Sequence, residues 1–214
     1  SIDVWLRQYI ENDIWLALAF FGVLGLGSSI ISLPFSVYST FVIEEKFGFN
    51  KTTVKTLIVD MIKGALLGVI IGAPLGALII WFYYELGEYF WITAWVVMTV
   101  FSLFMTMFAA SWIMPLFNKF TPLKEGELRA AIEAYCDKVG FKLTNLFVMD
   151  GSKRSGKSNA FFSGLGPKKK IVLYDTLIEQ MTTEEIVAVL AHEIGHYKKQ
   201  HTKQSLILSI VQTG

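Results

Sequence analysis

The positions of charged residues divide the chain into long apolar segments and a later mixed segment. Three runs contain no Asp, Glu, Lys or Arg, and they cover 30, 21 and 30 residues at 14–43, 64–84 and 89–118. An apolar helix of about 20 residues is long enough to cross the hydrocarbon core of a bilayer. The pattern therefore predicts a membrane region over 1–118 with three transmembrane helices, at about 14–36, 64–84 and 89–115.

Charge becomes frequent after this region, since residues 119–214 carry 24 charged side chains and residues 1–118 carry 13. Apolar residues at helical spacing predict an amphipathic helix over 125–139 that stops at Gly140. Strand-sized apolar runs follow at 146–149, 159–163 and 171–174, with a turn at 164–167 between the last two. We expect a folded domain over 119–204, and we interpret 205–214 as the start of a fourth span that continues beyond Gly214.

Composition supports a membrane protein and excludes other classes. Hydrophobic residues make up 53% of the chain and the formal net charge is +1. Intrinsic disorder needs low hydrophobicity and high net charge, and nucleic-acid-binding domains are usually strongly basic, so neither class is favoured. The only cysteine, Cys136, has no partner for an intrachain disulfide and cannot form a thiolate zinc cluster.

Lysines near the ends of the predicted spans suggest an orientation. The connection between the first two spans contains Lys46, Lys51, Lys55 and Lys63, whereas the connection at 85–88 has two glutamates and no basic residue. Loops with excess lysine and arginine usually lie in the cytoplasm. We therefore expect the domain after the third span to face the cytoplasm.

A second helix, beginning at Thr182, carries the candidate chemistry. Thr182 and Glu185 have the spacing of a capping box, and the helix then contains His192-Glu193-Ile194-Gly195-His196. Residues four apart lie on one helix face, so both imidazoles can bind one zinc ion, and Glu193 beside them can act as general base toward a zinc-activated water. This HExxH pattern predicts a zinc peptidase, with His192 and His196 as metal ligands and Glu193 as the catalytic residue.

A catalytic zinc normally has three protein ligands, and the third is missing from this pattern. His201 follows nine residues after His192, which in a continuing helix is a rotation of about 180°. We therefore expect His201 to point away from the metal, as an exposed or interfacial side chain. No acidic residue follows Glu193. The third ligand of a single zinc per chain is expected beyond Gly214.

Several segments together resemble the CAAX prenyl protease 1 family of integral-membrane zinc metallopeptidases. In chain order they are IEEKFGFNKTT at 43–53, PLFNKFTPL at 115–123, DGSKRS at 150–155, SNAFF at 158–162, IVLYDTL at 171–177 and HEIGH at 192–196. The resemblance implies a mainly α fold, with multi-pass transmembrane helices plus a small α+β zincin-like metalloprotease domain on the cytoplasmic side, in a bacterial inner membrane or the endoplasmic reticulum. It also implies a glutamate on a later helix as the third zinc ligand.

The same resemblance implies a substrate and a binding segment. Family members cleave peptide bonds, including the bond that releases the last three residues of prenylated proteins, and lay an extended substrate against an edge strand that corresponds to Asn159 and Ala160. Lys157 stands where some members have histidine, and Phe161 stands where tyrosine is usual.

Two alternatives remain open: an HtpX-like membrane quality-control protease, and an inactive membrane scaffold or chaperone.

Overall fold

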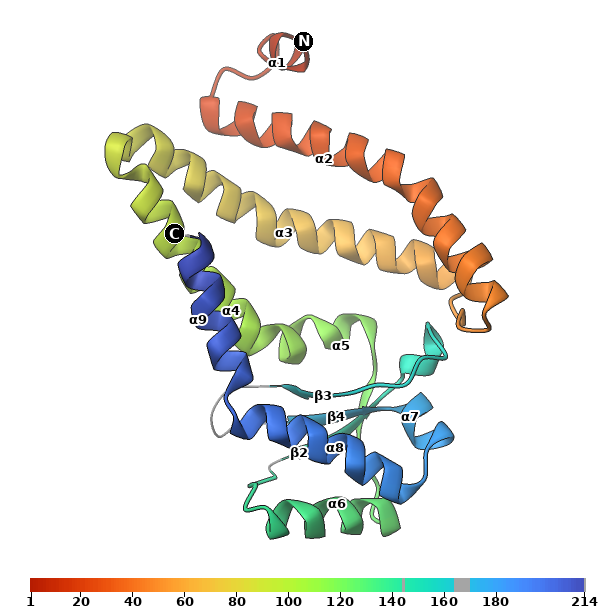
Figure 1. Cartoon of the computed structure of the whole chain (residues 1–214). Helices are drawn as coiled ribbons and strands as arrows, with labels where there is room; N and C mark the ends of the chain where they lie inside the picture. The colour runs from red at the N-terminus through yellow and green to blue at the C-terminus, as the bar shows by residue number, and fades with distance from the viewer. Residues whose placement is uncertain (144, 164–169, 214) are drawn as a thin grey trace. The chain divides into compact units, whose positions relative to one another are not determined.

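The computed structural model describes residues 1–143, 145–163 and 170–213. The chain divides into two compact units, Ser1–Val97 and Met98–Gly214. The described residues are mainly helical, and the second unit adds a four-stranded sheet (Figure 1). The predicted fold class, mainly α with membrane helices and a small α+β part, is therefore confirmed. The side of the membrane on which the sheet lies stays a prediction.

The first unit consists of helices that begin at polar caps. A short helix α1 (Ile2–Leu6) precedes α2 (Asp13–Tyr38), which continues as a π-helical segment, Ser39–Glu44. Helix α3 (Val54–Leu86) follows, and a 3-10 turn, Gly87–Tyr89, leads into α4 (Phe90–Trp112). The side chain of Asn12 accepts a hydrogen bond from the Ile14 N–H at 3.0 Å, and Thr53 accepts one from the Thr56 N–H at 3.1 Å. These side chains satisfy amide groups that have no partner within the helix.

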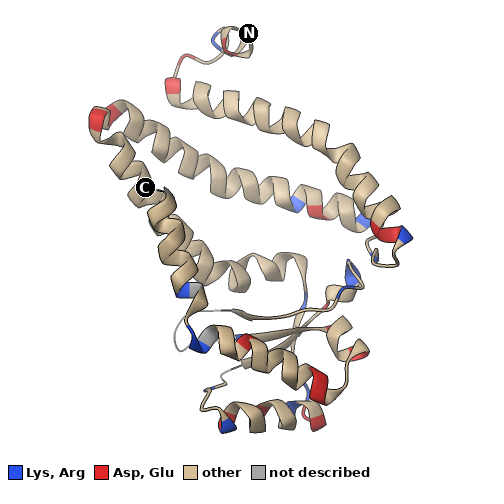
Figure 2. Ribbon diagram, viewed as in Figure 1, with Lys and Arg blue, Asp and Glu red and all other residues tan. Residues whose placement is uncertain are grey.

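Helices α2, α3 and α4 cover the three apolar runs of the sequence. They appear uncharged along most of their length in Figure 2, and the charged residues of α3 are Lys55, Asp60 and Lys63 near its start and Glu85 in its last turn. Two continuous stretches, Asp13–Glu44 and Val54–Phe117, are long and apolar enough to cross a membrane. Large apolar side chains such as Phe35 and Ile31 are about 70% exposed, at 74% and 69%. Such exposure suits contact with lipid or with further helices, while the exact span boundaries stay a prediction.

The second unit is built around a sheet with the strand order β1-β2-β4-β3. After the short helix α5 (Met114–Phe117), the strands are β1 (Phe120–Pro122), β2 (Asn145–Met149), β3 (Ala160–Ser163) and β4 (Lys170–Tyr174). Strand β1 runs antiparallel to β2, β2 parallel to β4, and β3 antiparallel to β4. The three predicted strands are confirmed, whereas β1 was not predicted. The predicted turn at 164–167 lies outside the described residues.

Four helices accompany the sheet: α6 (Glu127–Lys138), α7 (Asp175–Gln180), α8 (Thr183–Lys198) and α9 (His201–Thr213). The predicted amphipathic helix corresponds to α6, and Gly140 follows it with a φ of +65°, as expected for a glycine that ends a helix. The predicted capping box is also confirmed. The Thr182 N–H donates to Glu185 Oε2 at 2.8 Å, and the Glu185 N–H donates to Thr182 Oγ1 at 3.3 Å.

Helices α6 and α8 pack against each other and against the sheet (Figure 1). The core between them contains the side chains of Ile132, Cys136, Leu146, Ile171, Leu173, Ile186, Leu190 and Ile194. Burying one aliphatic side chain of this size stabilises the fold by about 1.5–3 kcal/mol. Burial also raises the pKa of the Cys136 thiol, so this cysteine is a packing residue. The result is that α8 is held firmly along one face.

The loop after β2 ties the sheet to the chain that leaves α5. Asp150 accepts a hydrogen bond from the Lys119 N–H at 2.6 Å, and Arg154 donates to Asn118 Oδ1 at 2.6 Å and to the Phe117 carbonyl at 2.8 Å. On the other side, the Ser152 N–H donates to Asp175 Oδ1 at 2.8 Å, at the start of α7. This loop therefore joins the end of the apolar region to the four-stranded sheet.

The tight approach of this loop to β4 generates a first prediction. A Cβ placed on Gly151 would overlap the ring of Tyr174, whereas a Cβ on Gly126 meets nothing within 4 Å. Gly151→Ala should therefore destabilise the second unit by about 1–3 kcal/mol, a typical cost of overpacking. Thermal unfolding of the detergent-solubilised protein measures the effect, with Gly126→Ala as the matched control. Equal midpoints for the two variants would contradict the packing described here.

Candidate metal centre

Helix α8 brings the two predicted metal ligands together on one face. The Nε2 atoms of His192 and His196 lie 3.0 Å apart, and their ring centroids are 4.6 Å apart at an interplanar angle of 66°. Both side chains are exposed. The geometry follows from the helical repeat, because residues four apart lie one above the other. Two imidazole nitrogens at this distance need a shared proton or a cation, since two lone pairs would otherwise face each other.

The chemistry of this pair fits a zinc ion. Zinc binds histidine nitrogen at 2.0–2.1 Å and prefers a tetrahedral arrangement, which separates two nitrogen ligands by about 3.3 Å. The observed separation of 3.0 Å is within a small side-chain rotation of that value. Among the described residues, no cluster of three His, Cys, Asp or Glu side chains converges on a common point. The two histidines therefore form part of a site that needs a further ligand.

Glu193 lies on the same helix, directly after the first histidine. It is half-buried, at the border between the exposed histidine face and the apolar face of α8 that includes Ile194. Consecutive helix residues are separated by a rotation of about 100°, so Glu193 is beside the histidine pair and cannot lie directly over it. A carboxylate in this position can accept a proton from a water molecule held at the histidines.

His201 lies elsewhere than the sequence predicts. Helix α8 ends at Lys198, Gln200 adopts a left-handed conformation with φ 55°, and a new helix begins at His201. The chain thereby turns, and Nδ1 of His201 comes to 2.8 Å from Nδ1 of His196. The expectation of one continuing helix was wrong, because α8 ends before His201 and the chain turns back toward His196. A non-glycine residue in this conformation costs about 1–2 kcal/mol, which the surrounding contacts must offset.

The contact of His201 is with the far side of His196. It approaches Nδ1, whereas the nitrogen that faces His192 is Nε2. These two nitrogens lie on different edges of the imidazole ring, so His201 does not reach the point toward which His192 and His196 converge. Lys199 and Gln200 are both compatible with a continuing helix, so no local signal in the sequence marks this turn.

The predicted substrate-binding residues lie at the edge of the sheet beside α8. Strand β3 is an outer strand of the order β1-β2-β4-β3, and α8 contacts it. The Tyr174 N–H donates to the Asn159 carbonyl at 3.0 Å, so Asn159 faces β4 and the backbone of Ala160 faces the opposite edge. The Ala160 N–H is bonded to the side chain of Asn159 at 2.9 Å, and the Ala160 side chain is buried.

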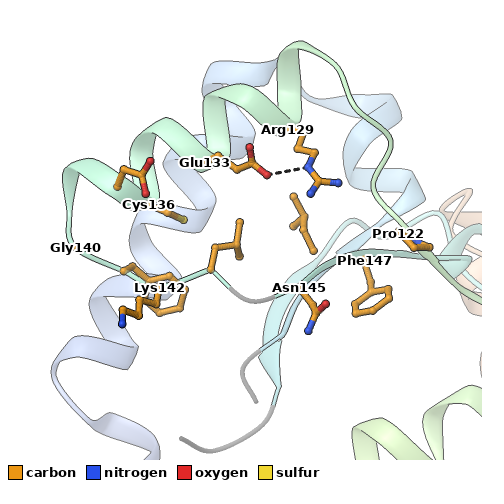
Figure 3. Close-up of a pocket in the computed structure, with 12 residues that line it drawn as sticks. Pro122, Arg129, Glu133, Cys136, Gly140, Lys142, Asn145 and Phe147 are labelled. Atoms are coloured by element: carbon orange, nitrogen blue, oxygen red, sulfur yellow. Dashed lines mark hydrogen bonds and ion pairs between the residues drawn. The ribbon is translucent and has the colours of Figure 1, made fainter. Parts of the chain in front are cut away.

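A pocket on another part of the second unit has no residue of the histidine pair. It is lined by α6, by the segment after it and by β2, with the ion pair between Arg129 and Glu133 at its side (Figure 3). The hydrogen bond from Arg129 to Glu133, 2.8 Å long, raises the pKa of the guanidinium above its ordinary value. This pair stabilises α6 across one turn, and the pocket is separate from the candidate metal centre.

Two family models match consecutive parts of the chain. The model described as "CAAX prenyl protease N-terminal, five membrane helices" matches residues 1–119, and "Peptidase family M48" matches residues 122–213. The second match includes the histidine pair and Glu193. Together the two matches cover both units of the structure.

Proteins named CAAX prenyl protease 1, or a homolog of it, are similar to this chain in a plant and in a yeast. The chain is 50% identical over 198 residues to a CAAX prenyl protease 1 homolog of Arabidopsis thaliana, covering 92% of this chain and 47% of that protein. It is 46% identical over 209 residues to CAAX prenyl protease 1 of Saccharomyces cerevisiae, covering 97% of this chain and 46% of that protein.

A solved structure agrees with these matches. The crystal structure of S. mikatae Ste24p superposes with a TM-score of 0.89 at 47% identity, over 94% of this chain and 47% of that one. The chain thus spans about half the length of the relatives it matches. With a membrane model and a peptidase model matched in succession over nearly all of its residues, the chain belongs to the CAAX prenyl protease 1 family of M48 metallopeptidases.

Proposed function

We propose that the whole protein is a membrane-embedded zinc metalloendopeptidase. The observation that carries this proposal is the pair of Nε2 atoms of His192 and His196, 3.0 Å apart on the exposed face of α8, with Glu193 beside them. Membership of the M48 family implies a metal, and the choice of zinc follows from the nitrogen donors. One zinc per chain is expected.

In the proposed mechanism, His192 and His196 would hold the metal through Nε2. Zinc bound there would supply Lewis acidity and lower the pKa of a water molecule. The carboxylate of Glu193 takes the proton of the attacking water and later delivers it to the leaving amine. Both roles need a carboxylate within hydrogen-bond reach of the water, and the position of Glu193 directly after His192 on α8 supports them.

The third ligand is proposed to be a glutamate in a later part of the protein. This chain has no acidic residue after Glu193, and it spans about half the length of its relatives. The open side of the histidine pair, which is exposed to solvent in the described residues, leaves room for such a ligand.

Strand β3 is the proposed binding edge for an extended peptide. An added strand would pair with the backbone at Ala160 and would lie beside α8, which contacts β3. Backbone pairing of this kind holds a peptide in place with little demand on its side chains. We propose that the substrates are the carboxyl-terminal segments of prenylated proteins, as the name CAAX prenyl protease of the relatives suggests.

The proposed location is the endoplasmic reticulum or a bacterial inner membrane, with the metal site toward the cytoplasm. The lysines at 46, 51, 55 and 63 between α2 and α3 support this orientation, because cytoplasmic loops carry an excess of basic residues. The two named alternatives, an HtpX-like protease and an inactive scaffold, receive less support. The high identity to CAAX prenyl protease 1 disfavours the first, and the complete set of His192, Glu193 and His196 disfavours the second.

Removing the proposed general base should separate metal binding from chemistry. Glu193→Gln in the whole protein should lower kcat by about 10²–10⁴-fold, the usual contribution of general acid–base catalysis. Its zinc content should equal that of wild type, because both histidines remain. Peptide cleavage and elemental analysis on the same preparation measure the two quantities. Turnover near the wild-type rate would remove Glu193 from the mechanism.

Removing one ligand should instead affect the metal itself. His196→Ala should bind zinc at well below one ion per chain after dialysis against dilute chelator, because a single histidine of the pair remains. Lys199→Ala, an exposed position three residues later, is the matched control and should retain wild-type zinc. Full zinc occupancy in His196→Ala would contradict the proposed site.

Pairing at the β3 edge can be tested from the substrate side. N-methylation of the peptide bond nitrogen that faces Ala160 removes one hydrogen bond and adds a steric group, so KM should rise by about 2–10-fold or more. The same peptide methylated outside the paired segment is the control. If methyl groups near the scissile bond leave KM unchanged, backbone pairing does not bind the substrate.

A further inference from the structure

The three histidines of the second unit contact one another in order, His192 with His196 and His196 with His201. His192 and His196 face each other through Nε2 at 3.0 Å, and His196 and His201 face each other through Nδ1 at 2.8 Å. The rings of His196 and His201 have centroids 4.8 Å apart and are nearly perpendicular, at 78°. His196 thus uses one nitrogen toward the first histidine and the other toward the second.

The metal role of His196 fixes the hydrogen positions along this chain. A histidine that binds zinc through Nε2 must keep its proton on Nδ1 if it is neutral. The Nδ1–H of His196 then donates to Nδ1 of His201, which must be the unprotonated nitrogen of that ring. His201 is therefore the acceptor in the Nε2–H form. The contact distance of 2.8 Å is in the range of a good hydrogen bond.

We propose that His201 is a positioning residue that orients His196 and keeps its Nε2 available to the metal. This inference rests on the proposed zinc site and goes beyond it, because it assigns a role to a side chain that does not reach the metal. A partner on the second ring nitrogen fixes the tautomer and increases the basicity of a ligating histidine. Here the partner comes from the first residue of α9, behind the left-handed turn at Gln200.

The turn at Gln200 is the structural device that makes this contact possible. In an uninterrupted helix, His201 would lie five residues after His196, and a rotation of about 500°, or 140° beyond a full turn, would carry it to another face. The left-handed residue breaks this progression and folds His201 back. His201 is half-buried, whereas its neighbour Lys203 on α9 is exposed. The latter therefore offers a matched control on the same helix.

The test uses zinc affinity of the whole protein in detergent, measured by competition with a chromophoric chelator. His201→Ala and His201→Phe should weaken zinc binding by about 10–100-fold, the usual effect of losing a partner of a ligating histidine. His201→Asn, whose amide oxygen lies near the position of Nδ1, should restore affinity to within about threefold of wild type. Lys203→Ala should match wild type. Each variant should still reach one zinc at saturating metal.

The outcomes separate this inference from the proposed function. If wild type takes up no zinc, or if His192→Ala binds it as tightly as wild type, the proposed metal site itself is wrong. If wild type binds zinc and all three His201 variants bind it equally well, the positioning role is refuted while the site stands. If His201→Ala cannot reach one zinc at any concentration, His201 is a direct ligand and the inference is also refuted. Equal losses in the Asn and Phe variants would indicate packing alone and would overturn it.

Discussion

The candidate site depends on the burial of one stripe of α8. Ile186, Leu190 and Ile194 recur every four residues and are at most 2% exposed, so this stripe is fixed against the sheet and α6. His192 and His196 each follow a member of the stripe by two residues, a rotation of about 200°. Packing therefore directs both imidazoles to the opposite, exposed face. A helix that was free to rotate would leave two histidines in sequence without a common direction in space.

The features that follow from local interactions were predictable from sequence. Uncharged runs determine the three long helices, and the Thr182–Glu185 capping box marks the start of α8 within one residue of its observed position. The spacing of His192 and His196 fixes their common face because it depends only on the helical repeat. The strands β2, β3 and β4 also emerged as short apolar runs between polar loops.

The features that depend on distant contacts were missed. Strand β1 has three residues and ends at Pro122, and it forms because the chain pairs with β2, about 27 residues away. Helix α7 has six residues and is stabilised where Asp175 accepts the hydrogen bond from the Ser152 N–H. The left-handed turn at Gln200 opposes the local preference of its residue type. Such a conformation persists only when tertiary contacts over-determine it, and no local pattern records them.

The edge strand and the histidine helix share one core, which relates the two halves of the proposed site to each other. The side chain of Ala160 is 4% exposed and belongs to the same buried cluster as Ile186, Leu190 and Ile194. Its backbone, on the edge away from β4, is therefore held at a fixed position relative to α8. Close-packed cores do not deform continuously. A peptide paired with this edge would therefore meet the histidine pair in one register, which is the condition for cleaving one bond of an extended chain that has few distinguishing side chains.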